Sequence, residues 1–257
     1  DILWIGARTT GNPFSVQEIA DSLIGVDIPV LIKNPLNPDI QLWIGALERI
    51  NKAGIKKIVA VHRGFHSTEQ TPFRYAPMWN LPIDLKTMLP QLPMFCDVSH
   101  ISGNRDLIPI IAQESMNLNM DGLMIETHIN PDKALSDAKQ QVTPEQLFNI
   151  INQLQIRKAT SQDIIFKTKL EKLRNSLDKI DNDLLYLLAE RMKLSEEIGY
   201  YKKENNVTIF QVERWKKTLS DSIEQGKLLG LDENFIRKIF SRIHGESIKR
   251  QAEIMNE

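Results

Sequence analysis

The hydrophobic pattern of this 257-residue chain changes its period near residue 160, and this change limits the possible folds more than any other feature. Before it, short apolar runs alternate with helix-like segments at the spacing of βα units, which implies a parallel sheet covered by helices. After it, strand signals vanish and apolar residues recur at intervals of three and four. We therefore expect an α/β part followed by an all-α part. The expected strands lie within residues 2–7, 28–33, 56–64, 92–100 and 122–126.

All five expected strands end in ionisable side chains. These are Arg8, Lys33, His62 with Arg63, His100 and Glu126. In a β/α barrel the active-site groups sit at the carboxyl ends of the strands, and these residues fit that position. Five strands do not close an eight-stranded barrel, so we expect the C-terminal five βα units of a TIM-type (β/α)8 barrel, with three strands upstream of Asp1. An open doubly wound sheet is the structural alternative.

The second half predicts one helix of near forty residues, from Phe166 to about Glu204. A helix of this length needs a partner along much of it, and a homodimer supplies one. Two further helices complete an all-helical, dimerising domain. We expect boundaries at residues 1–156 for the barrel part, 157–165 for a linker and 166–257 for the helical domain. The apolar seam consists of Leu170, Leu173, Leu177, Ile180, Leu184, Leu187, Leu194, Ile198 and Tyr201.

Composition excludes several classes of function. The 32 basic and 33 acidic residues nearly cancel, so the charge balance indicates neither a nucleic-acid partner nor an anionic membrane surface. No apolar run approaches the roughly 20 residues that span a bilayer, and no signal-peptide pattern opens the chain. Cys96 is the single cysteine, which fits a reducing compartment. We expect a cytoplasmic protein.

Several polar residues of the helical half point to an anion site. Arg191 occupies a seam position that the pattern predicts to be apolar, and a buried guanidinium needs an anion. Lys202 follows eleven residues later, within about 20° of Arg191 around the helix and roughly 16 Å along it. Ser247 and Gln251 share a face of the last helix, whereas Arg174 faces elsewhere and suits a pocket on another chain. A salt bridge within the bundle is the alternative for Arg191, and exposed surface is the alternative for Lys202 and Ser247.

The stretch "LRNSLDKIDNDLLYLLAERMKLSEEIGYYKKENN", followed by "GESIKRQ", resembles the all-helical class of chorismate mutases from Leu170 to Ile254. The resemblance implies that Arg174 from a partner chain, Arg191 and Lys202 bind the carboxylates and ether oxygen of chorismate. Ser247 and Gln251 complete the pocket, and no cofactor is needed because a Claisen rearrangement is pericyclic. Gln211 and Trp215 stand where many members carry acids that contact the substrate hydroxyl. Glutamine can still hydrogen-bond there, tryptophan cannot accept a hydrogen bond, and Glu213 is a substitute.

The α/β half carries a nitrogen and oxygen set, His100, Glu126 and Asp137, that suits a divalent ion such as manganese, iron, cobalt or zinc. Arg8, Lys33 and Arg63 end three successive strands and can together clamp a phosphate and a carboxylate.

The motifs "IGARTT", "LIKNP", "HRGF", "DVSHISGNRD", "IETHINP" and "ALSDAKQQ" resemble the barrel of type I beta-like 3-deoxy-D-arabino-heptulosonate 7-phosphate (DAHP) synthases over residues 1 to about 155. The resemblance implies condensation of phosphoenolpyruvate with erythrose 4-phosphate, aided by a divalent metal acting as a Lewis acid. It also implies a fourth metal ligand, a cysteine in a G-P-C motif, and an erythrose-phosphate motif on earlier strands, which we expect upstream of Asp1. By resemblance, phosphoenolpyruvate binds to Gly6, Ala7, Arg8, Lys33 and Arg63, and the metal to His100, Glu126 and Asp137.

Taken together, these features predict a DAHP synthase barrel fused to a C-terminal chorismate mutase, in which the mutase domain reports pathway output to the synthase. One alternative makes the helical half mainly a dimerisation module that senses chorismate or prephenate. Another is a metal-dependent aldolase on the same barrel, which the clamp of Arg8, Lys33 and Arg63 disfavours.

Overall fold

The computed structural model describes residues 1–158 and 160–256. The chain divides into two compact units, Asp1–Thr160 and Ser161–Glu257, which we term the α/β unit and the helical unit. None of the helices within the described residues combines the length and apolar character needed to cross a membrane.

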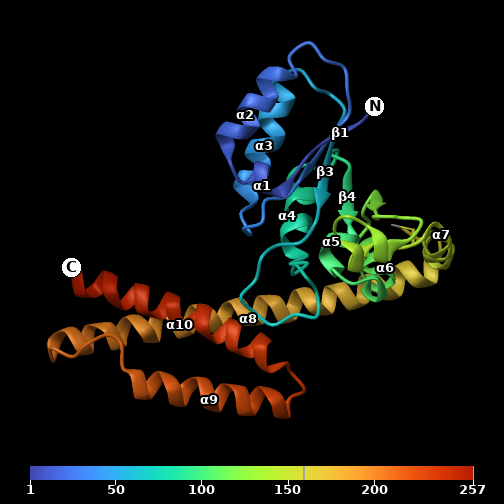
Figure 1. The fold of residues 1–257 in the computed structure, drawn as a ribbon. Coiled ribbons are helices and arrows are strands. Elements are labelled where there is room, and N and C mark those ends of the chain that lie inside the picture. The colour runs from blue at the N-terminus through green and yellow to red at the C-terminus, as the bar shows by residue number, and fades with distance from the viewer. Residues whose placement is uncertain (159, 257) are drawn as a thin grey trace. The chain divides into compact units, whose positions relative to one another are not determined.

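The α/β unit is built on a five-stranded parallel sheet whose strands follow one another in chain order (Figure 1). Leu3 pairs with Val30, Val30 with Ile58, Ala60 with Met94, and Phe95 with Gly122. A doubly wound sheet would reverse its strand order at a switch point, and this sheet does not. The expected partial TIM-type barrel is therefore confirmed. The strands are β1 (Leu3–Ile5), β2 (Val30–Lys33), β3 (Ile58–His62), β4 (Met94–Asp97) and β5 (Gly122–Met124).

Helices connect these strands, and local sequence signals explain where several of them begin. Asn12 and Asp39 accept hydrogen bonds from backbone N–H groups at the starts of α2 and α3, as N-cap residues do. Thr143 and Gln146 form a capping box at the start of α7. The helices are α1 (Ala7–Thr10), α2 (Pro13–Ser22), α3 (Ile40–Lys52), α4 (Asn80–Met88), α5 (Val98–Ser102), α6 (Ile108–Asn117) and α7 (Pro144–Gln153). Short 3₁₀ turns lie at η1 (Arg105–Leu107), η2 (Pro131–Lys133) and η3 (Ala138–Gln140).

The core of the α/β unit lies between the sheet and its helices. Helix α3 shows how the sequence builds it, because Trp43, Ala46, Leu47 and Ile50 recur at helical spacing and are all buried. The Trp43 indole N–H donates to the carbonyl of Ile32 in β2 at 3.1 Å, so the buried ring leaves no polar group unpaired. Each such large apolar side chain contributes about 1.5–3 kcal/mol when fully buried.

Two features of this unit differ from the sequence pattern. Helix α4 lies where no helical periodicity was recognised, and Pro82 sits at its third residue, where a missing N–H is tolerated. The strand expected at residues 92–100 ends at Asp97, so His100 lies in the one-turn helix α5 and not on the strand itself. Asp97 caps that helix by accepting the His100 backbone N–H at 3.1 Å.

The helical unit consists of α8 (Ile164–Glu204), α9 (Val212–Leu228) and α10 (Glu233–Asn256). The expected long helix is confirmed at 41 residues and begins after Asp163, whose carboxylate accepts the N–H groups of Ile165 and Phe166. Helix α10 packs along the C-terminal half of α8. A side chain at Gly199 would come within 3.1 Å of Ile254 and 3.3 Å of Gln251, so glycine allows this close approach.

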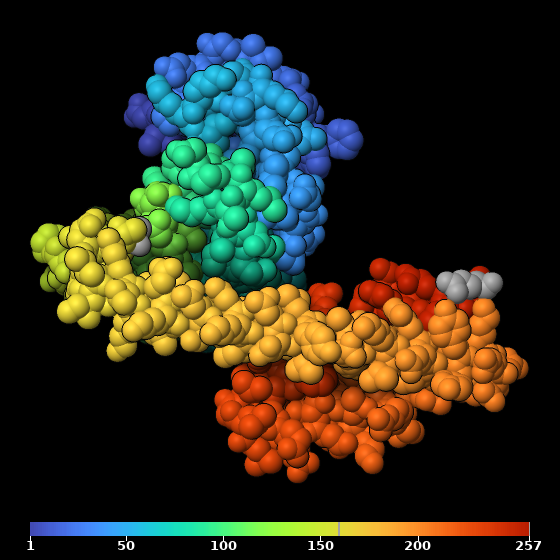
Figure 2. Space-filling view, turned by 180° about the vertical axis from the view of Figure 1, so that it is seen from behind, coloured from blue at the N-terminus to red at the C-terminus, as the bar shows by residue number. Residues whose placement is uncertain are grey.

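The apolar seam of α8 is largely uncovered within a single chain. Leu173, Leu177, Ile180 and Leu184 keep 53–61% of their surface exposed. Figure 2 shows α8 as a long rod in yellow to orange. Such a contiguous apolar stripe marks an association surface.

Candidate functional site

The predicted site residues of the α/β unit gather at the carboxyl edge of the sheet. Because the strands are parallel and in register, the segments that follow them meet at one edge (Figure 1). Gly6 caps α1 and is followed by Ala7 and Arg8, Lys33 ends β2, and Arg63 follows β3 directly. Glu126 lies two residues beyond β5, and Asp137 precedes η3 with a left-handed backbone, at φ of 49°.

Asp97 joins two groups of predicted site residues. One of its carboxylate oxygens, Oδ2, lies 2.7 Å from the Lys33 ammonium and 2.9 Å from Nδ1 of His100. Asp97 is fully buried. Burial alone would raise the pKa of Asp97, but the hydrogen bond from His100 and the charge of Lys33 outweigh it and lower that pKa. Asp97 is therefore a carboxylate that holds both Lys33 and His100 in place.

His100, Glu126 and Asp137 form a set that fits a divalent ion. Their ligand atoms all lie within 4.8 Å of one another. Ligands about 2.1 Å from a shared ion lie at most about 4.2 Å apart, so small side-chain movements suffice to complete the site. Nδ1 of His100 lies 2.9 Å from Asp97 and 3.6 Å from Glu126, so a buried carboxylate stands beside this predicted ligand, as in metal sites where a carboxylate orients a histidine.

A series of hydrogen bonds connects two of these predicted ligands, Glu126 and Asp137. Arg74 donates to Asp137 at 2.6 Å and to the side-chain oxygen of Gln140 at 2.7 Å. The Gln140 amide nitrogen then donates to Glu126 at 2.8 Å. The Arg74–Gln140 pair thus positions two predicted metal ligands, although it touches no ion itself.

We predict that Gln140→Leu weakens divalent metal binding about 10- to 100-fold, because Glu126 loses the donor that orients it. Titration with Mn²⁺, followed by calorimetry, measures this. Gln113→Leu is the control, since Gln113 bonds to Asn117 and Gln155, away from the cluster. Unchanged Mn²⁺ affinity in Gln140→Leu would show that the pair does not support the metal site.

Arg63 lies in a cationic, aromatic environment beside the metal set. Its guanidinium carbon stands 3.5 Å from the centre of the Tyr75 ring, and Arg74 approaches the same ring at 5.6 Å. Burial would raise the pKa of Tyr75, but the hydrogen bond with Arg63 and the charges of Arg63, Arg74 and Arg8 lower it. Among the described residues, Nη1 of Arg63 is buried without a hydrogen-bond partner, which suits an incoming anion.

His62 takes no part in this arrangement although it ends β3. Its ring is fully buried against Phe65 and Trp79, with centroids 5.7 and 5.0 Å away. Burial lowers the pKa of His62 to about 3, so the ring is neutral at physiological pH. Of the two polar residues predicted at this strand end, Arg63 alone joins the cluster.

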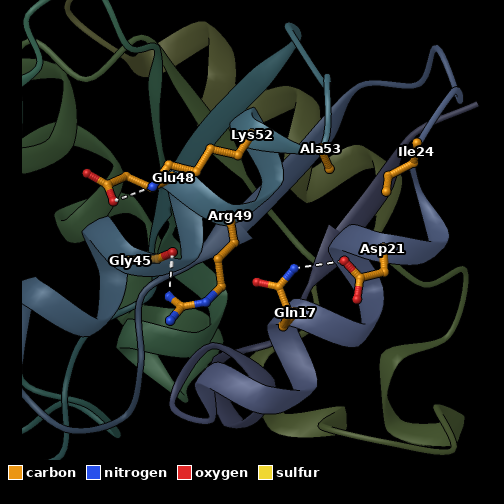
Figure 3. Close-up of a pocket in the computed structure, with 8 residues that line it drawn as sticks. All are labelled: Gln17, Asp21, Ile24, Gly45, Glu48, Arg49, Lys52 and Ala53. Atoms are coloured by element: carbon orange, nitrogen blue, oxygen red, sulfur yellow. Dashed lines mark hydrogen bonds and ion pairs between the residues drawn. The ribbon is translucent and has the colours of Figure 1, made fainter.

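A hollow of about 340 Å³ between α2 and α3 lies on the outer helical layer, away from the carboxyl edge (Figure 3). Its polar side chains bond within their own helices, Gln17 to Asp21 at 2.8 Å and Arg49 to the Gly45 carbonyl at 2.9 Å. These contacts leave no buried charge facing the hollow, so it does not compete with the edge cluster as an active site.

In the helical unit, Arg191 and Ser247 meet across α8 and α10. Arg191 donates to the Ser247 hydroxyl at 2.5 Å, and Ser195 lies 3.2 Å from the same oxygen. Burial lowers the pKa values of Arg191 and of Lys202, whose ammonium donates to the carbonyl of Ile209. Both cations donate to neutral oxygens, so within the described residues neither is neutralised by a carboxylate. The salt bridge considered for Arg191 does not form, and both charges are left for an anion.

The other predicted residues of this site differ in their placement. Gln251 is buried on α10, and its side-chain oxygen has no hydrogen-bond partner among the described residues. Gln211 is exposed at the N-cap of α9 and makes no capping bond through its side chain. Arg174 is exposed on α8, about 25 Å along the helix from Arg191, so a single chain does not bring these two together.

Sequence reasoning missed several residues that the structure brings to the two sites. Asp97, Arg74, Tyr75 and Gln140 bond to predicted residues that are distant in the chain, and spacing alone does not reveal such contacts. In the helical unit the missed residue is His244, whose ring stacks on Trp215 with centroids 4.0 Å apart and 5° between planes. Its position three residues before Ser247, on the same helical face, is a signal that could have found it.

Each unit matches a family model in comparisons with known proteins. Residues 1–176 match the family model "DAHP synthetase I family", and residues 173–252 match "Chorismate mutase type II". The phospho-2-dehydro-3-deoxyheptonate aldolase of Thermotoga maritima is 30% identical over 154 residues, which cover 60% of this chain and 44% of that protein. A bifunctional chorismate mutase/prephenate dehydratase of Buchnera aphidicola is 34% identical over 90 residues, covering 35% of this chain and 23% of that protein.

A solved structure agrees with these matches. A truncated form of DAHP synthase from Thermotoga maritima superposes with a TM-score of 0.51 at 26% identity, covering 69% of this chain and 59% of that one. The chain thus spans about half the length of the synthases that it resembles.

Proposed function

Because the chain belongs to the DAHP synthetase I family and ends in a chorismate mutase type II region, we propose that it serves two steps of aromatic biosynthesis. The helical unit rearranges chorismate to prephenate. The α/β unit contributes the phosphoenolpyruvate and metal sites for condensation with erythrose 4-phosphate to DAHP. We propose functional boundaries at 1–156 and 166–257 with a linker at 157–165, and a cytoplasmic location.

The observation that carries the mutase proposal is the pair of cations on α8 held only by neutral oxygens. Arg191 and Lys202 bind the carboxylates and the ether oxygen of chorismate, and Ser247 orients the guanidinium. In this proposal the Gln251 amide N–H donates to the ether oxygen of the breaking bond. A Claisen rearrangement requires no nucleophile or cofactor, so compacting the dianion and stabilising negative charge on oxygen are sufficient. Gln211 and Arg174 complete the pocket in our proposal, Arg174 from the partner chain.

The contacts around Asp97 and Tyr75 support the synthase proposal. Lys33, Arg63 and Arg8, with the backbone at Gly6 and Ala7, bind the phosphate and carboxylate of phosphoenolpyruvate. The divalent ion is bound by His100, Glu126 and Asp137. Manganese, iron, cobalt and zinc are the candidates, because all four accept nitrogen and oxygen ligands. When bound, such an ion supplies Lewis acidity toward the aldehyde of erythrose 4-phosphate. Lys33 and His100 share Asp97, so the phosphoenolpyruvate and metal sites are adjacent.

We further propose that the helical unit forms a homodimer through α8. The exposed leucine seam needs a partner helix, and the distance between Arg174 and Arg191 means that a complete pocket requires two chains.

Leu184→Glu therefore yields monomers with little mutase activity, because a charge enters the seam and Arg174 no longer reaches its pocket. Light scattering after size exclusion measures the mass, and chorismate turnover the activity. Lys179→Glu, about 140° around the helix from Leu184, is the matched control. A Leu184→Glu protein that stays dimeric and active would place the dimer contact elsewhere.

The experiment that tests the two activities uses the intact chain. Calorimetric titration with phosphoenolpyruvate, with and without Mn²⁺, tests the α/β unit, and the fall in chorismate absorbance tests the helical unit. Chorismate binding without turnover would make the helical unit a sensor module instead of an enzyme.

A further inference from the structure

Helix α10 carries a third polar group on the face that holds Ser247 and Gln251. His244 precedes Ser247 by three residues and Gln251 by seven, so all three point toward the same side of the helix. The His244 ring lies flat on Trp215 of α9, with centroids 4.0 Å apart, and contacts Phe210 at a centroid distance of 6.0 Å. The two aromatic rings fix the orientation of the imidazole.

The imidazole ring has an unused polar atom. Nε2 of His244 is buried and, among the described residues, has no hydrogen-bond partner. A buried nitrogen without a partner is unfavourable, so such an atom in a native fold needs a partner from outside the chain, a ligand or a water. Burial, followed by the positive charges of Arg191 and Lys202, lowers the pKa of His244. The ring therefore stays neutral beside two cations.

Charge decides which part of a ligand this nitrogen suits. The two cations, Arg191 and Lys202, are the partners for carboxylates. A neutral imidazole both accepts and donates a hydrogen bond, so it suits a neutral alcohol. Trp215, which supplies the stacking surface, has only an N–H donor and cannot accept from a hydroxyl.

We propose that His244 binds the ring hydroxyl of chorismate through Nε2 and so determines specificity for a hydroxylated dicarboxylate. This inference rests on the proposed mutase function. Trp215 acts as the rigid surface that positions the imidazole. The ring hydroxyl is not altered in the rearrangement, so His244 contributes to binding the substrate and its transition state alike.

The test compares chorismate with an analogue in which hydrogen replaces the ring hydroxyl, using the wild type, His244→Phe and His244→Gln. Phenylalanine keeps an aromatic ring on Trp215 but removes the nitrogen, whereas glutamine restores a hydrogen-bonding group. For chorismate we expect His244→Phe to raise KM about 10- to 100-fold with kcat little changed, and His244→Gln to recover part of the loss. For the deoxy analogue we expect the wild type and His244→Phe to have the same KM.

An equal loss for both ligands would show that the ring only supports the fold, and no loss for either would show that it does not contact substrate; both results overturn the proposal. If the wild type binds chorismate without turnover, dissociation constants replace KM in this comparison. Calorimetry measures them for the same three proteins with chorismate and with the deoxy analogue. A wild type that neither binds nor converts chorismate would overturn the mutase function itself, and the inference with it. The thermal midpoint of each variant separates misfolding from lost contact.

Discussion

Arg191→Ala lowers the rate of chorismate rearrangement by about 10²–10³ or more, the largest effect that we expect in the helical unit. The guanidinium donates to the Ser247 hydroxyl at 2.5 Å, which holds it on the face of α8 that packs against α10. Alanine removes both the hydrogen bond to Ser247 and the positive charge that faces the substrate. The loss of chorismate absorbance under saturating substrate measures the change.

Two further variants make the Arg191 result specific. Arg191→Lys keeps the charge but loses the planar fork, so it retains only part of the activity. Arg237→Ala removes an exposed arginine of α10 that pairs with Glu233 at 3.0 Å, and it leaves turnover unchanged. Equal rates for Arg191→Ala and Arg237→Ala would contradict the proposed pocket.

Asp97→Asn costs about 3 kcal/mol or more of the free energy of unfolding of the α/β unit. The substitution leaves the nearly buried Lys33 ammonium without its carboxylate, and an unpaired buried charge is the main source of the cost. It also weakens Mn²⁺ binding about 10- to 100-fold, because a neutral amide replaces the carboxylate that orients the His100 ring. Urea unfolding followed by circular dichroism and Mn²⁺ titration measure the two effects.

Asp27→Asn is the matched control for Asp97→Asn. Asp27 pairs with Lys57 at 3.1 Å, but both side chains are exposed, and such surface pairs contribute about 0–1 kcal/mol. We expect neither stability nor metal affinity to change measurably. If Asp97→Asn behaves like Asp27→Asn, the buried carboxylate does not hold the two sites together.

The elements that sequence predicted well are those with a strong periodic signal. Helix α8 was recognised because its apolar residues repeat over several heptads, and the strands because short apolar runs alternate with helix-like segments. Helix α4 was missed because Pro82 interrupts a short segment with weak amphipathic character. His100 was placed on a strand because the cap formed by Asp97, which turns the chain into α5, depends on local hydrogen bonds.

The site residues likewise include some that sequence predicted and some that it missed. Sequence motifs indicated Lys33, Arg63 and His100, but not Asp97, whose side chain reaches Lys33 at the end of β2 and His100 in α5 only in the folded sheet. Arg74 and Asp137 are 63 residues apart in sequence, and only the fold brings them within 2.6 Å. His244 shares a helical face with Ser247, but its stacking on Trp215 of another helix could not be predicted from that spacing.

The measurement that tests the central claim most directly is the conversion of chorismate to prephenate by the wild-type chain, once with Mn²⁺ and once with EDTA. Our account predicts turnover at the same rate in both, because the cations of α8 need no metal. The absence of turnover, or turnover that requires Mn²⁺, would contradict it.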